Sequence, residues 1–180
     1  MRNYDRLGMV FHEFRTNRNI SLKQVADEAP TVLATLLQEI PQLLGVKESD
    51  YDMTHITDTA VAYQNRLAYL CGNDDLFLQF LSLNAAGIIS AASCVLSPAF
   101  VKIYNLFKAN QPQQAFTVFA QISPLVKACY LETNPTCIKY VLAKLKYGNG
   151  LVRLPLGPIS AENQAKLDGL LAQTPKEFLI

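Results

Sequence analysis

A lysine at the end of an apolar run is the residue whose type and position best suit covalent chemistry. Lys47 follows the apolar stretch 43–46 and precedes the polar residues 48–50. A short apolar run that ends in a polar loop predicts a buried strand, with the lysine near its carboxyl end. In parallel α/β sheets and barrels, catalytic groups lie at that end. Burial disfavours the charged form of an amine, and a neutral lysine attacks a carbonyl carbon to form a Schiff base.

The position of Lys47 also has a second interpretation. A lysine at a strand end can lay its aliphatic stem along the protein and keep its ammonium group in water, with no chemical role. Position alone favours this second interpretation. The choice between the two therefore depends on the rest of the chain.

The cysteines and histidines do not predict a metal site. The four cysteines are Cys71, Cys94, Cys129 and Cys137, and no two of them have Cys-x-x-Cys spacing. The two histidines, His12 and His55, are far apart in the sequence and far from the cysteines. We therefore expect reduced cysteines that pack in the core, a surface histidine at position 55, no metal and no cofactor.

Length and composition predict one globular domain, with room for a small appendage. The chain has 180 residues, of which half are hydrophobic, and its net charge is +1. Such a small charge gives no field that would collect nucleic acid or an anionic membrane, so we expect neither as a partner. The sequence shows no signal-peptide pattern and no apolar run long enough to span a bilayer. A cytoplasmic location is expected.

The first segment, residues 1–29, differs from the rest of the chain. Apolar residues recur at helical spacing over 7–14, and Ser21 begins a capping-box pattern for a second short helix. This segment resembles the opening of the helix-turn-helix domain in Rgg-type transcriptional regulators. A DNA reader also needs a recognition helix with basic side chains, but no Lys or Arg occurs between Lys23 and Lys47. We interpret the segment as a helical cap or arm.

Residues 30–180 alternate between helical and strand patterns, which predicts βα units and a parallel sheet. The expected helices are 31–39, 53–64 and 74–83, and the expected strands are 43–47, 67–71 and 87–90. Beyond residue 98 the periodicity is purely helical. The fold class expected from this order is α/β with about three parallel strands and a C-terminal helical region.

Five stretches together resemble a known family. They are LLGVKES (43–49), LCGNDDL (70–76), AAGIISAASCVLSP (85–98), ETNPTCIKYVL (132–142) and VRLPLGPIS (152–160). In this order and at these separations, they resemble the last part of the dihydrodipicolinate synthases. These enzymes belong to the pyruvate-dependent class I aldolases, which also include N-acetylneuraminate lyase. The resemblance implies the C-terminal portion of a TIM (β/α)8 barrel.

The resemblance also implies chemistry and site residues. Lys47 matches the family's Schiff-base lysine, which condenses with the ketone of pyruvate. Gly72 and Ile89 match positions that line the pyruvate pocket, the isoleucine through its backbone carbonyl, and Ser49 is expected to form part of the wall. The enamine would then attack a small aldehyde, aspartate semialdehyde in the lysine-biosynthesis enzymes. No cofactor takes part.

Two family motifs have no counterpart in this sequence. They are the Gly-Thr-Thr-Gly-Glu loop, which holds the pyruvate carboxylate, and the Tyr-Asn-x-Pro segment with its proton-shuttling tyrosine. Groups that act as a unit fail together, so the expected lyase is a truncated or inactive form. Two alternatives stay open, an Rgg-like DNA-binding regulator fragment and a non-catalytic fusion fragment. A three-stranded sheet cannot close into a barrel, and its open edges predict a homo-oligomer.

Overall fold

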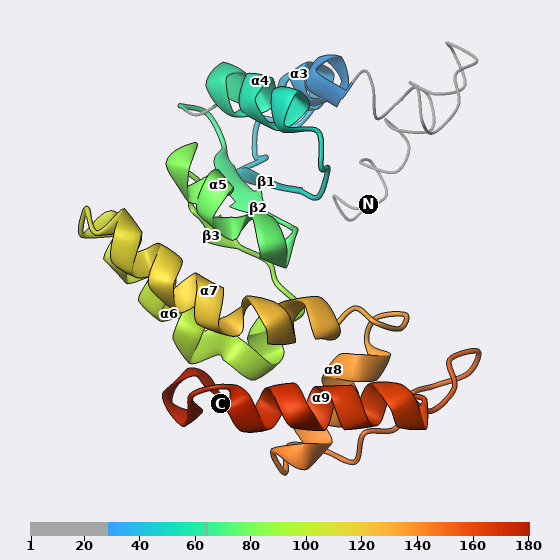
Figure 1. The fold of residues 1–180 in the computed structure, drawn as a ribbon. Coiled ribbons are helices and arrows are strands. Elements are labelled where there is room, and N and C mark those ends of the chain that lie inside the picture. The colour runs from blue at the N-terminus through green and yellow to red at the C-terminus, as the bar shows by residue number, and fades with distance from the viewer. Residues whose placement is uncertain (1–28, 64) are drawn as a thin grey trace. The chain divides into compact units, whose positions relative to one another are not determined.

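The computed structural model describes residues 29–63 and 65–180 (Figure 1). The predicted helix-turn-helix-like segment lies outside the described residues, apart from its last position. The chain divides into two compact units. The first comprises Met1–Val46 and Asp52–Ala68, and the second comprises Lys47–Tyr51 and Tyr69–Ile180. All four site residues expected from the sequence belong to the second unit.

Two helices make up most of the described part of the first unit. They are α3 (Ala29–Glu39) and α4 (Met53–Tyr63). Each buries one stripe of residues at helical spacing, Val32, Leu33 and Leu36 in α3 and Ile56, Thr59 and Ala60 in α4. The Arg66 guanidinium donates to the carbonyl oxygens of Leu43 (3.0 Å) and Pro41 (2.8 Å). The apolar periodicity of the sequence predicts both helices to within two residues.

Three short strands form one sheet in the order β1-β2-β3. They are β1 (Gly45–Glu48), β2 (Ala68–Cys71) and β3 (Gly87–Ile88). Strands β2 and β3 are parallel, with Leu70 opposite Gly87 and Cys71 opposite Ile88. The carboxyl ends of these two strands therefore lie at the same edge of the sheet.

Strand β1 runs in the same direction as β2. The Ala68 amide donates to the Leu44 carbonyl (2.8 Å), and four residues later in both segments the Gly72 amide donates to the Glu48 carbonyl (2.6 Å). Bonds that advance together along two strands are those of a parallel pair. The prediction of about three parallel strands is confirmed.

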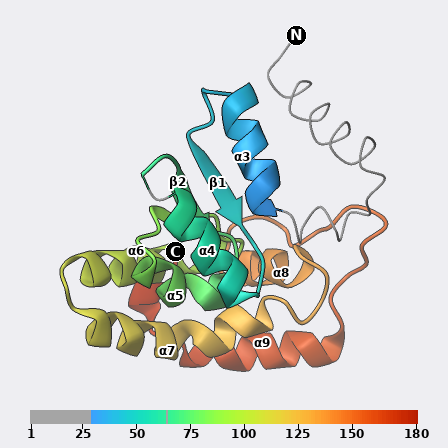
Figure 2. The same cartoon turned by 90° about the horizontal axis from the view of Figure 1, so that it is seen from above.

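The second unit is mainly helical. Its helices are η1 (Asp74–Leu76), α5 (Phe77–Ser82), α6 (Ser93–Lys108), α7 (Pro112–Ala128), α8 (Thr136–Lys144), α9 (Ala161–Gln173) and η2 (Lys176–Phe178). Helix α6 packs against α7 and α8, and α9 packs against the same two helices (Figure 1, Figure 2). The four helices thus form a closed cluster around a shared apolar core.

Helix α6 shows how this core is built. Its residues Val95, Ala99 and Ile103 recur every four positions and are fully or almost fully buried. The helix is broken at Leu96 (φ −118°, ψ 23°), two residues before Pro98, because proline disfavours helical geometry in the preceding turn. The Val95 carbonyl accepts a hydrogen bond from the Ile180 amide (3.1 Å), which ties the last residue to α6.

The cysteine prediction is confirmed at three positions and wrong at one. Cys71, Cys129 and Cys137 are buried free thiols, whereas Cys94 is exposed. Cys94 lies in the first turn of α6, beside the buried Val95. Neighbouring residues on a helix point about 100° apart, so one can face solvent while the next faces the core.

Burial raises the pKa of two of these thiols. The pKa of Cys71 rises from 9.0 to about 12, chiefly through desolvation, which outweighs the lowering effect of a backbone hydrogen bond with Asn73. Desolvation likewise raises the pKa of Cys129 to about 12. Above pH 9 the unfolded chain would release these protons while the folded chain holds them, so stability falls as pH rises.

We therefore expect an alkaline loss of stability of about 1 kcal/mol per thiol between pH 8 and pH 10. Chemical denaturation under reducing conditions at a series of pH values measures it. Cys71→Ala should flatten the decline relative to the unmodified chain. An equal decline in the Cys71→Ala variant would show that this thiol does not contribute.

Among the described residues, no helix is long and apolar enough to cross a membrane.

Candidate active site

Lys47 is the third residue of β1 and is exposed to solvent. Its strand neighbours Val46 and Glu48 are half-buried. Successive residues of a strand face opposite sides, so the side chain of Lys47 points to the side opposite those of Val46 and Glu48. Strand β1 is thus half-buried and not buried as expected, and the exposed lysine agrees with the second interpretation, in which its ammonium group stays in water. The chemical role of Lys47 stays a prediction.

Gly72 lies directly against the lysine. A Cβ atom built on Gly72 would lie 2.7 Å from Lys47 Cε, 2.0 Å from Ser49 Oγ and 2.6 Å from the Glu48 carbonyl oxygen. Only a residue without a side chain fits such contacts. Lys47, Ser49 and Gly72 are thus brought together at the carboxyl ends of β1 and β2.

Ile89 follows β3 at the same edge of the sheet. Its amide donates to the Cys71 carbonyl (2.8 Å), which places its backbone beside the residue that precedes Gly72. Its side chain is 51% exposed. The backbone of Ile89 therefore lies at the end of β3, beside the end of β2, the strand that leads to Gly72.

Hydrogen bonds fix the loop that follows β1. The Glu48 carboxylate oxygen Oε1 accepts from the amides of Ser49 (2.7 Å) and Asp50 (2.8 Å). The side-chain amide of Asn73 donates to the carbonyl oxygens of Ser49 (3.0 Å) and Asp50 (2.9 Å). Residues 48–50 are thus held by the Glu48 carboxylate and by the side-chain amide of Asn73.

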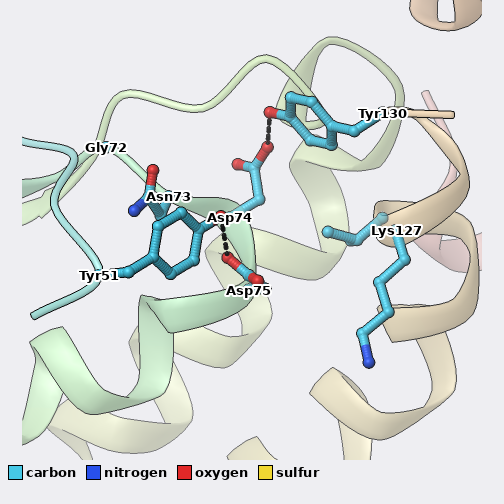
Figure 3. A pocket seen from close by; sticks show the side chains of 8 residues that line it. Tyr51, Gly72, Asn73, Asp74, Asp75, Lys127 and Tyr130 are labelled. Carbon is cyan, nitrogen blue, oxygen red and sulfur yellow. Dashed lines mark hydrogen bonds between the residues drawn. The ribbon is translucent and has the colours of Figure 1, made fainter. Parts of the chain in front are cut away.

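A pocket of about 250 Å³ lies beside this loop (Figure 3). Its lining residues are Tyr51, Gly72, Asn73, Asp74, Asp75, Val126, Lys127 and Tyr130. The Tyr51 hydroxyl donates to Asp75 Oδ1 (3.3 Å). In Figure 3 the side chain of Lys127 extends away from the Asp74 carboxylate. The polar groups of the pocket therefore come mainly from the segment after β2 and from the two tyrosines.

Asp74 is the buried polar residue of this pocket, with 2% of its surface exposed. Its Oδ2 accepts from the Ala92 amide (3.2 Å) and from the Tyr130 hydroxyl. Its Oδ1 has no hydrogen-bond partner among the described residues. The carboxylate thus joins η1 to the start of α6 and to the residues just after α7.

Both pocket tyrosines keep their protons at neutral pH. Burial, followed by the hydrogen bond to Asp74, raises the pKa of Tyr130 above its usual 10.0. Burial, followed by the charge of Asp75, raises the pKa of Tyr51. Each hydroxyl therefore acts as a donor to its carboxylate partner.

Sequence reasoning did not select Asn73, Asp74 or Tyr130 as site residues. A signal for the first two was present, because the stretch LCGNDDL sets three polar side chains directly after a strand. Tyr130 had no such signal, since it lies 56 residues from Asp74 in the sequence. Across residues 29–63 and 65–180, no three His, Cys, Asp or Glu side chains form a group that could hold a metal ion.

Comparison with known proteins gives a consistent result. Residues 12–174 match the sequence model of the dihydrodipicolinate synthetase family. The 4-hydroxy-tetrahydrodipicolinate synthase of Methanothrix thermoacetophila is 33% identical over 156 residues, which cover 86% of this chain and 52% of that enzyme. The chain thus spans about half the length of this relative. The family match begins within the 1–29 segment, whose likeness to a regulator stays a prediction.

Solved structures show the same partial correspondence. The 4-hydroxy-tetrahydrodipicolinate synthase of Methylacidiphilum fumariolicum aligns with a TM-score of 0.77 and 27% identity, over 82% of this chain and 49% of that one. The dihydrodipicolinate synthase of Acinetobacter baumannii, solved in complex with pyruvate, aligns with a TM-score of 0.74 and 26% identity, over 81% and 50%. Together with the three-stranded parallel sheet, these alignments show a partial α/β barrel. The chain belongs to the dihydrodipicolinate synthetase family.

Proposed function

We propose that the chain forms a Schiff base between Lys47 and the ketone of pyruvate. The observation that carries the proposal is the contact of Lys47 Cε and Ser49 Oγ with the backbone of Gly72 at the ends of two parallel strands. Family membership supports it, and so does the related Acinetobacter baumannii enzyme, which was solved with pyruvate. In a parallel barrel, strand ends are where catalytic side chains gather.

In the proposed reaction, the Lys47 amine in its neutral form adds to the C2 carbonyl of pyruvate. The carbonyl oxygen leaves as water, and a carbon–nitrogen double bond forms. Loss of a proton from the methyl carbon gives an enamine, which attacks a small aldehyde. Aspartate semialdehyde is the aldehyde that the family resemblance implies. Gly72, Ile89 and Ser49 would line the pocket for pyruvate.

Turnover by the chain alone is expected to be very low. The chain spans about half of its relative's length, and the motifs expected to hold the pyruvate carboxylate and shuttle protons have no counterpart in its sequence. Catalytic groups that act as a unit lose most of their effect when one is removed. The first covalent step is therefore the part of the reaction to measure. Self-association and a cytoplasmic location stay predictions.

Borohydride trapping tests the proposal. Borohydride delivers hydride to C2 of the imine and converts it to a secondary amine, so the chain should gain the mass of pyruvic acid less one oxygen atom. Peptide mapping should place this single adduct at Lys47. Lys47→Ala should abolish it, because the substitution removes the reacting nitrogen.

Lys166→Ala is the matched control, since Lys166 is an exposed lysine on α9. It should form the adduct as the unmodified chain does. Labelling spread over several surface lysines, or adduct formation that survives Lys47→Ala, would contradict the proposal. In that case the chain would be a non-catalytic member of its family.

A further inference from the structure

A side-chain amide holds the loop that carries the lysine. Asn73 uses both protons of its Nδ2 group, one on the Ser49 carbonyl (3.0 Å) and one on the Asp50 carbonyl (2.9 Å). We propose that Asn73 is a positioning residue, which sets the placement of Lys47 through these two bonds. This inference rests on the proposed Schiff-base function and adds a residue to it.

The two hydrogen bonds of Asn73 act on Lys47 through the neighbouring residues Ser49 and Gly72. Ser49 Oγ and Lys47 Cε both lie against Gly72, and the Gly72 amide donates to the Glu48 carbonyl (2.6 Å). Residues 72 and 73 therefore hold each carbonyl from 48 to 50. Movement of the loop would move Ser49 Oγ and change the direction of the lysine stem.

Asn73 is itself attached to a rigid base. Its carbonyl accepts from the Cys71 thiol (3.0 Å) and from the Leu76 amide (3.1 Å). The next residue, Asp74, is buried and bonded to the Ala92 amide and the Tyr130 hydroxyl. Asn73 thus cannot follow the loop if the loop shifts, and this is what allows it to fix the loop's position.

Asn73→Asp separates this role from simple packing. The two side chains have nearly the same shape, but an ionised aspartate has only acceptors and would face two carbonyl oxygens. The loop bonds would be lost and replaced by repulsion, while the fit of the side chain is kept. Attack on a carbonyl depends on near-attack geometry, and a displacement of about 1 Å can cost about 100-fold in rate.

The experiment measures the rate of pyruvate adduct formation at Lys47 in the full chain, at saturating and at low pyruvate. Asn73→Asp should lower the saturating rate about tenfold or more. Asn105→Asp makes the same chemical change at an exposed position of α6 and should leave the rate unchanged. Ser160→Ala removes the N-cap of α9 and serves as a variant that loses stability far from the loop.

Four outcomes are decisive. A lower saturating rate of adduct formation in Asn73→Asp, with unchanged rates in Asn105→Asp and Ser160→Ala, supports the inference. An unchanged rate in Asn73→Asp overturns it. Equal slowing in Asn73→Asp and Ser160→Ala also overturns it, because stability alone would then explain the loss. A lower affinity for pyruvate with an unchanged saturating rate would show that Asn73 acts on binding and not on the lysine.

A second measurement tests the positioning role even if the proposed Schiff-base function fails. If the unmodified chain forms no adduct, competitive acetylation still reports the surroundings of Lys47 relative to exposed Lys166. Asn73→Asp should then change the Lys47 to Lys166 labelling ratio at least twofold, and Asn105→Asp should not. An unchanged ratio overturns the positioning role independently of pyruvate.

Discussion

Gly72→Ala is expected to lower the free energy of unfolding by about 2–3 kcal/mol, at the upper end of the usual cost of overpacking. The new methyl group would lie 2.0 Å from Ser49 Oγ and 2.6 Å from the Glu48 carbonyl oxygen. The serine side chain can rotate away, but the carbonyl belongs to the backbone and moves only with the strand. The adduct at Lys47 should form more slowly as well, because Lys47 Cε would lie 2.7 Å from the same methyl group and the lysine stem would have to turn away from it.

The control is Gly169→Ala, which makes the same chemical change in α9. Apart from the nearby backbone of α9 itself and the two chain neighbours, no atom of the described residues lies within 4 Å of a Cβ built there, and alanine favours a helix over glycine by about 1 kcal/mol. The two substitutions should therefore change the free energy of unfolding in opposite directions. Urea denaturation measures both values. A neutral or stabilising Gly72→Ala would show that β1 and β2 separate easily at this point.

The fold was largely predictable because local apolar periodicity decides which segments become helices and strands. Helix α3 and strand β2 follow from patterns that need no knowledge of distant residues. The boundaries depend on tertiary contacts. Residues 74–83 read as one helix, but the structure has a 3-10 turn over Asp74–Leu76 before α5 begins. Asp74 is bonded to the Ala92 amide in that turn, a partner 18 residues away.

The candidate site was predictable only in part. The family resemblance selected Lys47 and Gly72, and the structure places them in contact. The sequence left two interpretations of Lys47 open, buried or water-facing, because burial depends on what covers a strand and not on the strand's own composition. The stretch LCGNDDL held a signal for Asn73, but its role was not visible in the sequence, because its hydrogen bond reaches a residue 23 positions away. Tyr130 had no signal, since its partner lies 56 positions away. Short motifs identify reacting groups better than the groups that hold them.

Asp74→Ala is expected to be as damaging as Gly72→Ala, although it lies outside the lysine loop. The substitution leaves the Ala92 amide and the Tyr130 hydroxyl without their acceptor. Losing hydrogen bonds to a charged group, and leaving buried donors unpaired, should cost about 3 kcal/mol. The start of α6 and the end of α7 would both lose a fixed contact with η1.

A double-mutant cycle separates the Asp74–Tyr130 hydrogen bond from the other effects of these residues. Tyr130→Phe removes only the hydroxyl and should cost about 1–2 kcal/mol. If the two side chains stabilise the fold through their mutual bond, then Tyr130→Phe should cost much less when Asp74 is already alanine. The coupling energy from urea denaturation should reach about 1 kcal/mol, well above the scatter expected for independent sites. Costs that simply add would contradict this, and the Ala92 amide would then be the partner through which Asp74 stabilises the second unit.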